Sequence, residues 1–180
     1  RHKQQEWIFK AALPICPSAS LPLKGRHNAL NCMAAMALVE PWVEPSVVAD
    51  YLCDFQGLEH RFQTVTEIAG VTFVNDSKAT NVGSTMAALD GLKRADNIVL
   101  IAGGDAKGAD LGPLAESLRG RVKRLIVLGK DGPSVVALAD QCGIPHLSVT
   151  SMEDAVVASI KNTTSGDLVL LSPACASLDM

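Results

Sequence analysis

Along the second half of the chain, short apolar runs alternate with segments whose apolar residues recur at helical spacing. The runs predict strands at 71–75, 98–102, 124–128, 146–149 and 168–171. The helical spacing predicts helices at 83–92, 111–118, 133–142 and 152–160. Strands separated by helices form βαβ units. The pattern therefore predicts an α/β fold with a doubly wound, mostly parallel sheet, to which 65–68 adds an antiparallel edge strand.

The first 56 residues follow a different pattern. Residues 7–9 predict a strand, and the prolines that follow predict an extended connector. Helices are expected from Asn28 to near Pro41 and over 46–55. The glycine-led break at 57–62 predicts a domain boundary, with one domain at 1–56 and another at 57–180.

Polar side chains gather where the predicted strands end. Asp76, Lys78 and Thr80 follow the strand 71–75, and Lys107 lies in a glycine-rich loop after the strand 98–102. Small residues up to Ser177 follow the strand 168–171, where they could open a helix whose free N–H groups face the same crevice. Ligands of open parallel sheets bind at this edge. Two ammonium groups with several hydroxyls suit a small dianion, although the same residues could simply cap helices and form turns.

Two further pairs of polar residues have both a functional and a structural interpretation. Asn28 and Asn31 lie about one helical turn apart, so their amides could read the edge of a heterocycle such as adenine, or be a cap and a solvated side chain. Arg61 beside His60 suits phosphate, because a guanidinium matches phosphate oxygens bidentately; the alternative is a surface ion pair with Glu59.

Composition excludes several other classes of function. The formal charge is −3 and the chain has one Tyr, two Trp and four Phe, which argues against nucleic acid as a partner. No apolar run reaches membrane-spanning length. The five cysteines are scattered without a Cys-x-x-Cys pair, which argues against a zinc site or a disulfide framework and is typical of a reducing, cytoplasmic location. The four histidines show no metal-ligand spacing.

Two nucleotide-binding fingerprints are absent from the sequence. The loop 103–110 does not fit G-x-G-x-x-G, which disfavours a dinucleotide-dependent oxidoreductase. No G-x-x-x-x-G-K-[ST] segment occurs in the chain. If the protein uses ATP, its phosphate-binding loop is therefore expected elsewhere.

Five motifs, taken in order and spacing, resemble the Mur ligases, and the resemblance covers roughly residues 21–180. The motifs are LKGRHNALN at 23–31, GLEHRF at 57–62, NDSKATN at 75–81, GGDAKGAD at 103–110 and LSPACASLD at 171–179. Each motif is weak alone, and the five in register are highly specific. Within the family, the match is to the member that adds D-glutamate to UDP-N-acetylmuramoyl-L-alanine.

The resemblance implies the end of a central ATPase domain at 1–56, followed by most of a Rossmann-like, amino-acid-binding ligase domain. It implies an ATP-dependent amide-bond ligase of peptidoglycan biosynthesis that works through an acyl phosphate. ATP and magnesium would be its cofactors, with the metal ligands outside this chain. Without a phosphate-binding loop, the chain is expected to bind ligand at best and not to catalyse.

The family also implies a role for each matched position. Asn28 and Asn31 would face adenine, His60 the nucleoside, Arg61 the ATP phosphate and Asp76 the ribose. The remaining residues would act on the amino acid and the transferred phosphate: Thr80, Lys107, Ser177 and the backbone of Leu178 would hold D-glutamate, and Lys78 would lie near the phosphate. The alternative is a Rossmann-like module that binds a nucleotide or an acidic metabolite without catalysis; a phosphate-binding loop upstream in the native gene would argue against it.

Overall fold

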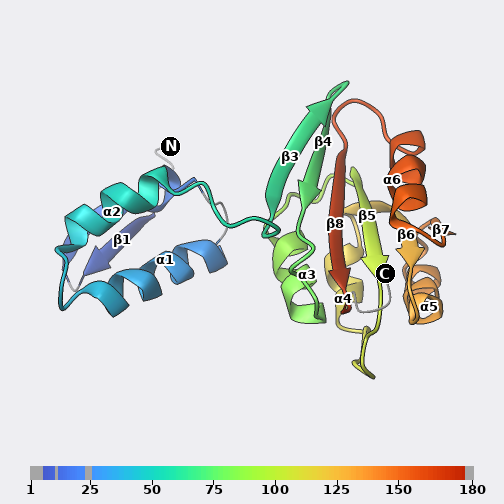
Figure 1. The fold of residues 1–180 in the computed structure, drawn as a ribbon, viewed down its shortest axis with the longest axis horizontal. Coiled ribbons are helices and arrows are strands. Elements are labelled where there is room, and N and C mark those ends of the chain that lie inside the picture. Colours follow the sequence, from blue (N-terminus) through green and yellow to red (C-terminus); the bar gives the residue numbers. More distant parts are fainter. Residues whose placement is uncertain (1–5, 11, 23–25, 177–180) are drawn as a thin grey trace. The chain divides into compact units, whose positions relative to one another are not determined.

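The computed structural model describes residues 6–10, 12–22 and 26–176 (Figure 1). Contacts along the chain divide it into two units, Arg1–Leu58 and Glu59–Met180. Each unit has its own hydrophobic core and is described by itself.

The second unit is built on a six-stranded sheet in the order β3-β4-β8-β5-β6-β7 (Figure 1). The strands are β3 (Gln63–Ile68), β4 (Val71–Asn75), β5 (Ile98–Gly103), β6 (Val122–Leu128), β7 (His146–Ser148) and β8 (Leu168–Ala174). Only β3 runs antiparallel, paired with β4 at the edge of this sheet. The predicted α/β fold with a mostly parallel sheet and an antiparallel edge strand is therefore confirmed.

Helices cover both faces of this sheet. The helices are α3 (Val82–Asp90), α4 (Leu114–Leu118), α5 (Gly132–Cys142) and α6 (Met152–Lys161). Side chains of α3, α4 and α5 pack with Leu100 on one face, whereas α6 packs with Val99 and Ile101 on the other. Because successive side chains of a strand point to opposite faces, a strand covered on both sides must be apolar throughout. This explains the uninterrupted apolar run of β5.

Strand β8 is longer than the sequence predicts. Residues 172–174, expected as a turn that opens a helix, continue the strand to Ala174. Pro173 cannot donate a hydrogen bond, and it lies where the pairing of β5 with β8 shifts register between Ile101 and Gly103. At the irregular register no ladder hydrogen bond from residue 173 is required, so the lack of an N–H on Pro173 does not end the strand.

The first unit is a two-stranded sheet with two helices. It contains β1 (Trp7–Lys10), β2 (Leu13–Pro17), a short 3-10 turn η1 (Ser18–Ser20), α1 (Arg26–Val39) and α2 (Pro45–Asp54). The predicted extended connector is thus partly a strand, since β2 pairs antiparallel with β1. Both strands of this sheet are edges, so Pro14 and Pro17 leave few ladder hydrogen bonds unmade.

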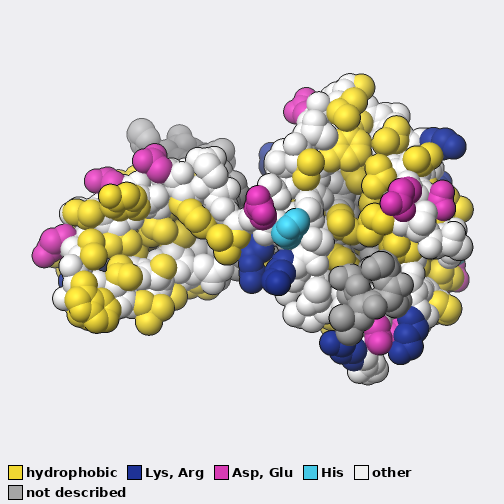
Figure 2. Space-filling view, in the orientation of Figure 1, with side chains coloured by type: hydrophobic (Ala, Val, Ile, Leu, Met, Phe, Trp, Pro, Cys, Tyr) yellow, Lys and Arg dark blue, Asp and Glu magenta, His cyan; other side chains and the backbone are white. Residues whose placement is uncertain are grey.

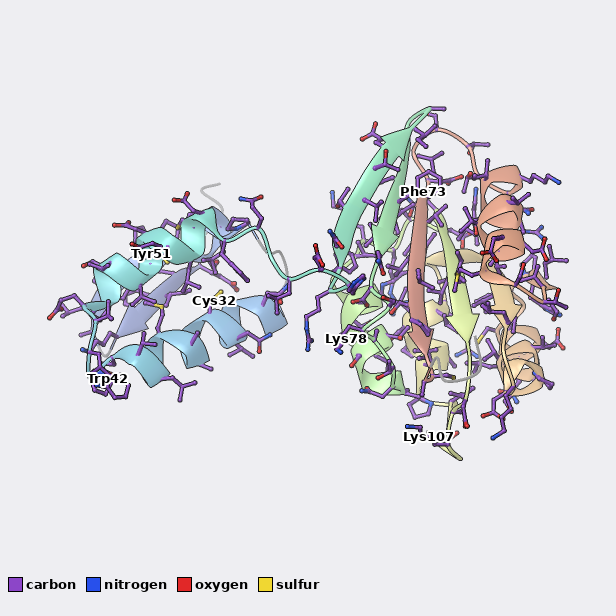
Figure 3. The ribbon with its side chains drawn as sticks, viewed as in Figure 1. Cys32, Trp42, Tyr51, Phe73, Lys78 and Lys107 are labelled. Carbon is purple, nitrogen blue, oxygen red and sulfur yellow. The ribbon has the colours of Figure 1, made fainter. Side chains whose placement is uncertain are left out.

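Helix α1 buries only part of its apolar surface within the first unit. Cys32 and Met36 are buried, whereas Leu30, Met33 and Leu38 are exposed, Leu38 by 74%. The helix is apolar on more than one side, and the small core of this unit covers only one of them. Other large apolar side chains of the unit are also exposed within the chain, including Trp42 and Tyr51 (Figure 3).

Candidate functional site

The loops that carry most of the predicted site residues lie at one edge of the six-stranded sheet. Strands β4, β8, β5 and β6 are consecutive and parallel, so their carboxyl ends meet at this edge. The loop from β4 to α3 carries Lys78, and the loop after β5 carries Lys107 (Figure 3). Figure 2 shows basic and acidic side chains side by side at this end of the unit.

Asp76 is buried directly after β4 and holds the loop in place. Its Oδ1 accepts from the backbone N–H of Phe62 at 3.0 Å, and its Oδ2 accepts from Ser172 Oγ at 2.9 Å. Ser172 Oγ also lies 3.0 Å from the hydroxyl of the buried Thr85 in α3. The carboxylate thereby ties the segment before β3 to β8 and reaches α3 through Ser172.

The rest of this loop turns around one anchored residue. The backbone oxygen of the buried Ala79 accepts from the N–H of Ala174, at the end of β8, at 3.0 Å. Lys78 and Thr80, on either side of Ala79, are exposed. Asn81 then caps the start of α3, because its side chain accepts from the N–H of Ser84 at 2.9 Å. The loop therefore presents an ammonium and a hydroxyl to solvent beside the end of β8.

The loop after β5 starts with two glycines that no other residue could replace without movement. A Cβ on Gly103 would meet the backbone oxygen of Leu128 at 1.8 Å, and one on Gly104 would meet that of Ala176 at 2.3 Å. These close approaches let Asp105 and Ala176 form a two-way backbone pair, with N–H···O distances of 2.8 and 2.9 Å. Ser177 and Leu178, predicted to bind D-glutamate, follow Ala176 and lie outside the described residues.

Lys107 has a left-handed backbone conformation in this loop, with φ of +53°. Its N–H donates to Asp105 Oδ1 at 2.8 Å, and Lys130 Nζ, from the loop after β6, donates to Asp105 Oδ2 at 3.1 Å. These two hydrogen bonds hold the pKa of the Asp105 carboxyl below its usual value. Asp105 is therefore ionised at neutral pH, with the Lys107 backbone N–H and Lys130 Nζ as hydrogen-bond donors.

His60 and Arg61 precede β3. The His60 backbone has φ of +64°, and its oxygen accepts from the N–H of Lys78 at 3.1 Å. Asn75 Nδ2 lies 3.0 Å from His60 Nδ1, so the two side chains are within hydrogen-bond distance. The structure thus brings His60 to the same loop as Lys78, and Arg61 beside it is exposed.

Asn28 and Asn31 lie in the first unit, on α1. Asn28 is half-buried and Asn31 is exposed. Residues three apart in a helix are neighbours on its surface, so the two amides share one side of α1.

Sequence reasoning gave no role to three side chains that shape this edge. They are Ser172, which bonds Asp76, and Lys130 and Asp131, which contact the Lys107 loop. The short GKDG segment after β6 was the available signal, since a charged pair between two glycines at a strand end sits where neighbouring loops meet. Sequence alone does not show which loop such a pair contacts.

Within residues 6–10, 12–22 and 26–176, no group of three or more His, Cys, Asp or Glu side chains could hold a metal ion. None of the helices in these segments is long and apolar enough to span a membrane. A groove of about 410 Å³ lies between β7 and α6, lined among others by Leu147, Asp154 and Val157. It contains none of the predicted site residues.

The family described as Mur ligase, glutamate ligase domain, matches residues 60–175. The UDP-N-acetylmuramoylalanine–D-glutamate ligase of Shewanella oneidensis is 50% identical over 96% of the chain, which covers 39% of that relative. The ligase of the same name from Nitrosomonas europaea is 44% identical over 97% of the chain, which covers 37% of its length. The chain thus spans about two-fifths of the length of these curated relatives.

Solved structures with low sequence identity share the fold. UDP-N-acetylmuramate-alanine ligase from Thermotoga maritima aligns with a TM-score of 0.70 at 19% identity, over 87% of this chain and 36% of that one. A bifunctional folylpolyglutamate synthase/dihydrofolate synthase from Yersinia pestis, complexed with AMPPNP and a Mn ion, aligns with a TM-score of 0.63 at 20% identity, over 87% and 37% of the two chains.

Proposed function

The chain belongs to the Mur ligase family, whose members are ATP-dependent ligases, and we propose that it is the carboxyl-terminal part of an enzyme that joins D-glutamate to UDP-N-acetylmuramoyl-L-alanine in peptidoglycan biosynthesis. One observation carries the proposal: the loop of Lys78–Thr80 bonds Ala174 at the end of β8 through Ala79, and the loop of Lys107 bonds Ala176, just after β8, through Asp105. An exposed hydroxyl and ammonium on these loops suit the carboxylates of an acidic amino acid.

The proposed chemistry forms an amide through an acyl phosphate. The alanyl carboxylate attacks the γ-phosphorus of ATP, which releases ADP, and the D-glutamate amine then attacks the acyl carbon. The tetrahedral intermediate collapses to the amide and inorganic phosphate. Such a reaction depends on positioning and on neutralising negative charge. Use of ATP and a UDP-linked precursor suits the cytoplasm.

Five predicted residues of the second unit act on the amino acid and the transferred phosphate. Thr80 and Lys107, with Ser177 and the Leu178 backbone, bind the two carboxylates of D-glutamate. Lys78 offsets charge on the phosphoryl group during transfer.

The remaining predicted residues are proposed to bind the nucleotide. Arg61 binds an ATP phosphate and His60 the nucleoside, while Asn28 and Asn31 read adenine. Asp76, directly after β4, is proposed to accept a hydrogen bond from a ribose hydroxyl. Magnesium is proposed as the second cofactor, with its ligands in the part of the enzyme outside this chain.

The test is an amide chemical-shift titration of the 180-residue chain with D-glutamate, L-glutamate and ATP. D-Glutamate is expected to shift the signals of Thr80 and Lys107 selectively, and L-glutamate to shift them less. In the full-length protein, Lys107→Ala should raise KM for D-glutamate by about tenfold to a hundredfold, because a charge-assisted contact is lost, and leave KM for ATP unchanged.

Lys93→Ala is the matched control. Lys93 is exposed and follows α3. Because α3 runs away from the site, Lys93 lies toward the amino-terminal ends of the parallel strands. Its removal should change neither KM. An equal rise of both KM values in Lys107→Ala, or no D-glutamate-dependent phosphate release by the full-length protein, would refute the proposed function.

A further inference from the structure

The loop between β6 and α5 contains a charged pair, Lys130 and Asp131, that the proposed function leaves without a role. Asp131 occupies the position before α5 at which an aspartate ordinarily caps a helix. Its side chain makes no capping hydrogen bond. Instead, Asp131 Oδ2 accepts from the backbone N–H of Ala106, in the neighbouring loop, at 2.6 Å.

We propose that Asp131 and Lys130 are positioning residues that hold the loop of Lys107 in the conformation that binds the substrate carboxylate. The proposal rests on the proposed function of Lys107. It goes further by assigning the orientation of Lys107 to contacts from a different loop, the one that follows β6.

The backbone contacts support a positioning role for Asp131. Its N–H donates to the oxygen of Gly104 at 2.9 Å, while its carboxylate receives the N–H of Ala106. One residue therefore fixes two points of the loop immediately before Lys107. Lys107 itself has φ of +53°, a region that non-glycine residues rarely adopt, and the following Gly108 has φ of +76°. A disfavoured conformation of this kind persists where surrounding contacts enforce it.

The charges support the role of Lys130. Asp105 lies two residues before Lys107, and its free carboxylate would repel an anionic ligand at Lys107. Lys130 Nζ bonds Asp105 Oδ2 at 3.1 Å, and the N–H of Lys107 bonds Asp105 Oδ1. Lys130 thus offsets part of the negative charge of Asp105, which lowers its repulsion of a carboxylate bound at Lys107.

The experiment compares KM values for D-glutamate and ATP in the full-length protein with Asp131→Ala, Asp131→Asn, Lys130→Gln and Lys107→Ala. Asp131→Ala is expected to raise KM for D-glutamate about tenfold, because a charge-assisted hydrogen bond is lost, while KM for ATP stays constant. Asp131→Asn keeps an oxygen acceptor for Ala106 and should restore KM to within about threefold of the wild type. Lys130→Gln should raise KM for D-glutamate a fewfold, about three to five times, since Lys130 is largely exposed and its pair is screened.

The outcomes separate this inference from the proposed function. If Lys107→Ala leaves KM for D-glutamate unchanged, the assignment of Lys107 fails and the inference fails with it. If Lys107→Ala raises that KM but Asp131→Ala and Lys130→Gln do not, only the inference is overturned. A rise of both KM values in Asp131→Ala without rescue by Asp131→Asn indicates a merely structural role and also overturns it. If Asp131→Ala does not fold, the exposed Lys130→Gln decides. An unchanged KM for D-glutamate in Lys130→Gln then overturns the inference.

Discussion

Replacing Gly104 with alanine tests whether the backbone pair between Asp105 and Ala176 depends on the absence of a side chain at position 104. The new Cβ would lie 2.3 Å from the backbone oxygen of Ala176 and 3.3 Å from Cys175 Cβ. Ordinary contact begins near 3.4 Å, so the two segments must separate by about 1 Å. That displacement breaks the two backbone hydrogen bonds of 2.8 and 2.9 Å between Asp105 and Ala176.

The expected cost follows from these two effects. Losing two hydrogen bonds costs about 2 kcal/mol, and placing alanine at φ of +119° costs about 1 kcal/mol more. We therefore expect Gly104→Ala to lower the free energy of unfolding of the second unit by about 3 kcal/mol. Gly108→Ala is the matched control, because Gly108 also has positive φ, +76°, but a Cβ there meets nothing within 4 Å. It should cost only about 1 kcal/mol.

The assay must report on the second unit alone. Both tryptophans, Trp7 and Trp42, lie in the first unit, so tryptophan fluorescence does not report directly on the unfolding of the second. Urea unfolding is therefore followed by the amide signals of β5, such as that of Leu100. If Gly104→Ala and Gly108→Ala lower the unfolding free energy equally, the close approach at Gly104 is absent and the reasoning is wrong.

Two further predictions concern buried polar groups, both read from the same urea unfolding of the second unit. Ser172→Ala removes the hydroxyl that donates to Asp76 in a buried setting, and should cost about 1–3 kcal/mol, with Thr163→Ala as an exposed-hydroxyl comparison expected to cost less than about 1 kcal/mol. Burial raises the pKa of the Asp167 carboxyl, but hydrogen bonds from Lys123 and Thr164 outweigh it and leave the pKa below its usual value. Because a lowered pKa contributes stability above the unfolded pKa, that stability should disappear as pH falls from about 4 through the folded pKa. Asp167→Asn should lower the free energy of unfolding by on the order of 2 kcal/mol at pH 7, and the gap between the unfolding free energies of variant and wild type should shrink in acid. A gap that stays constant with pH contradicts this assignment.

The sheet could be predicted from the sequence because its strands are covered on both faces. Burial of both faces turns a strand such as 98–102 into an uninterrupted apolar run, which is visible without any knowledge of its neighbours. The parallel order then placed the loops of Lys78 and Lys107 at one edge. Local signals failed where a partner overrides them: Pro173 sits in β8 because the pairing with β5 is irregular at that point.

The contacts that shape the candidate site could not be read from the sequence. Asp131 looks like a helix cap in the sequence, yet its carboxylate bonds Ala106, 25 residues away along the chain. Ser172 bonds Asp76 across 96 residues. Such pairings depend on the order of strands in the sheet, which neither periodicity nor composition specifies.

The position of β8 has a consequence for the order in which this unit folds. Of the six strands, β8 comes last in the sequence, but it lies between β4 and β5, which do not pair with each other. When residues 59–160 have left the ribosome, the sheet exists as two separate parts. One part is β3 with β4 and the other is β5 with β6 and β7, and the strand that joins them is still missing. The sheet closes only when residues 168–174 emerge and pair with both parts at once. Because such distant pairing is slow to form, the unit is expected to fold after its last strand has been synthesised, not progressively during translation.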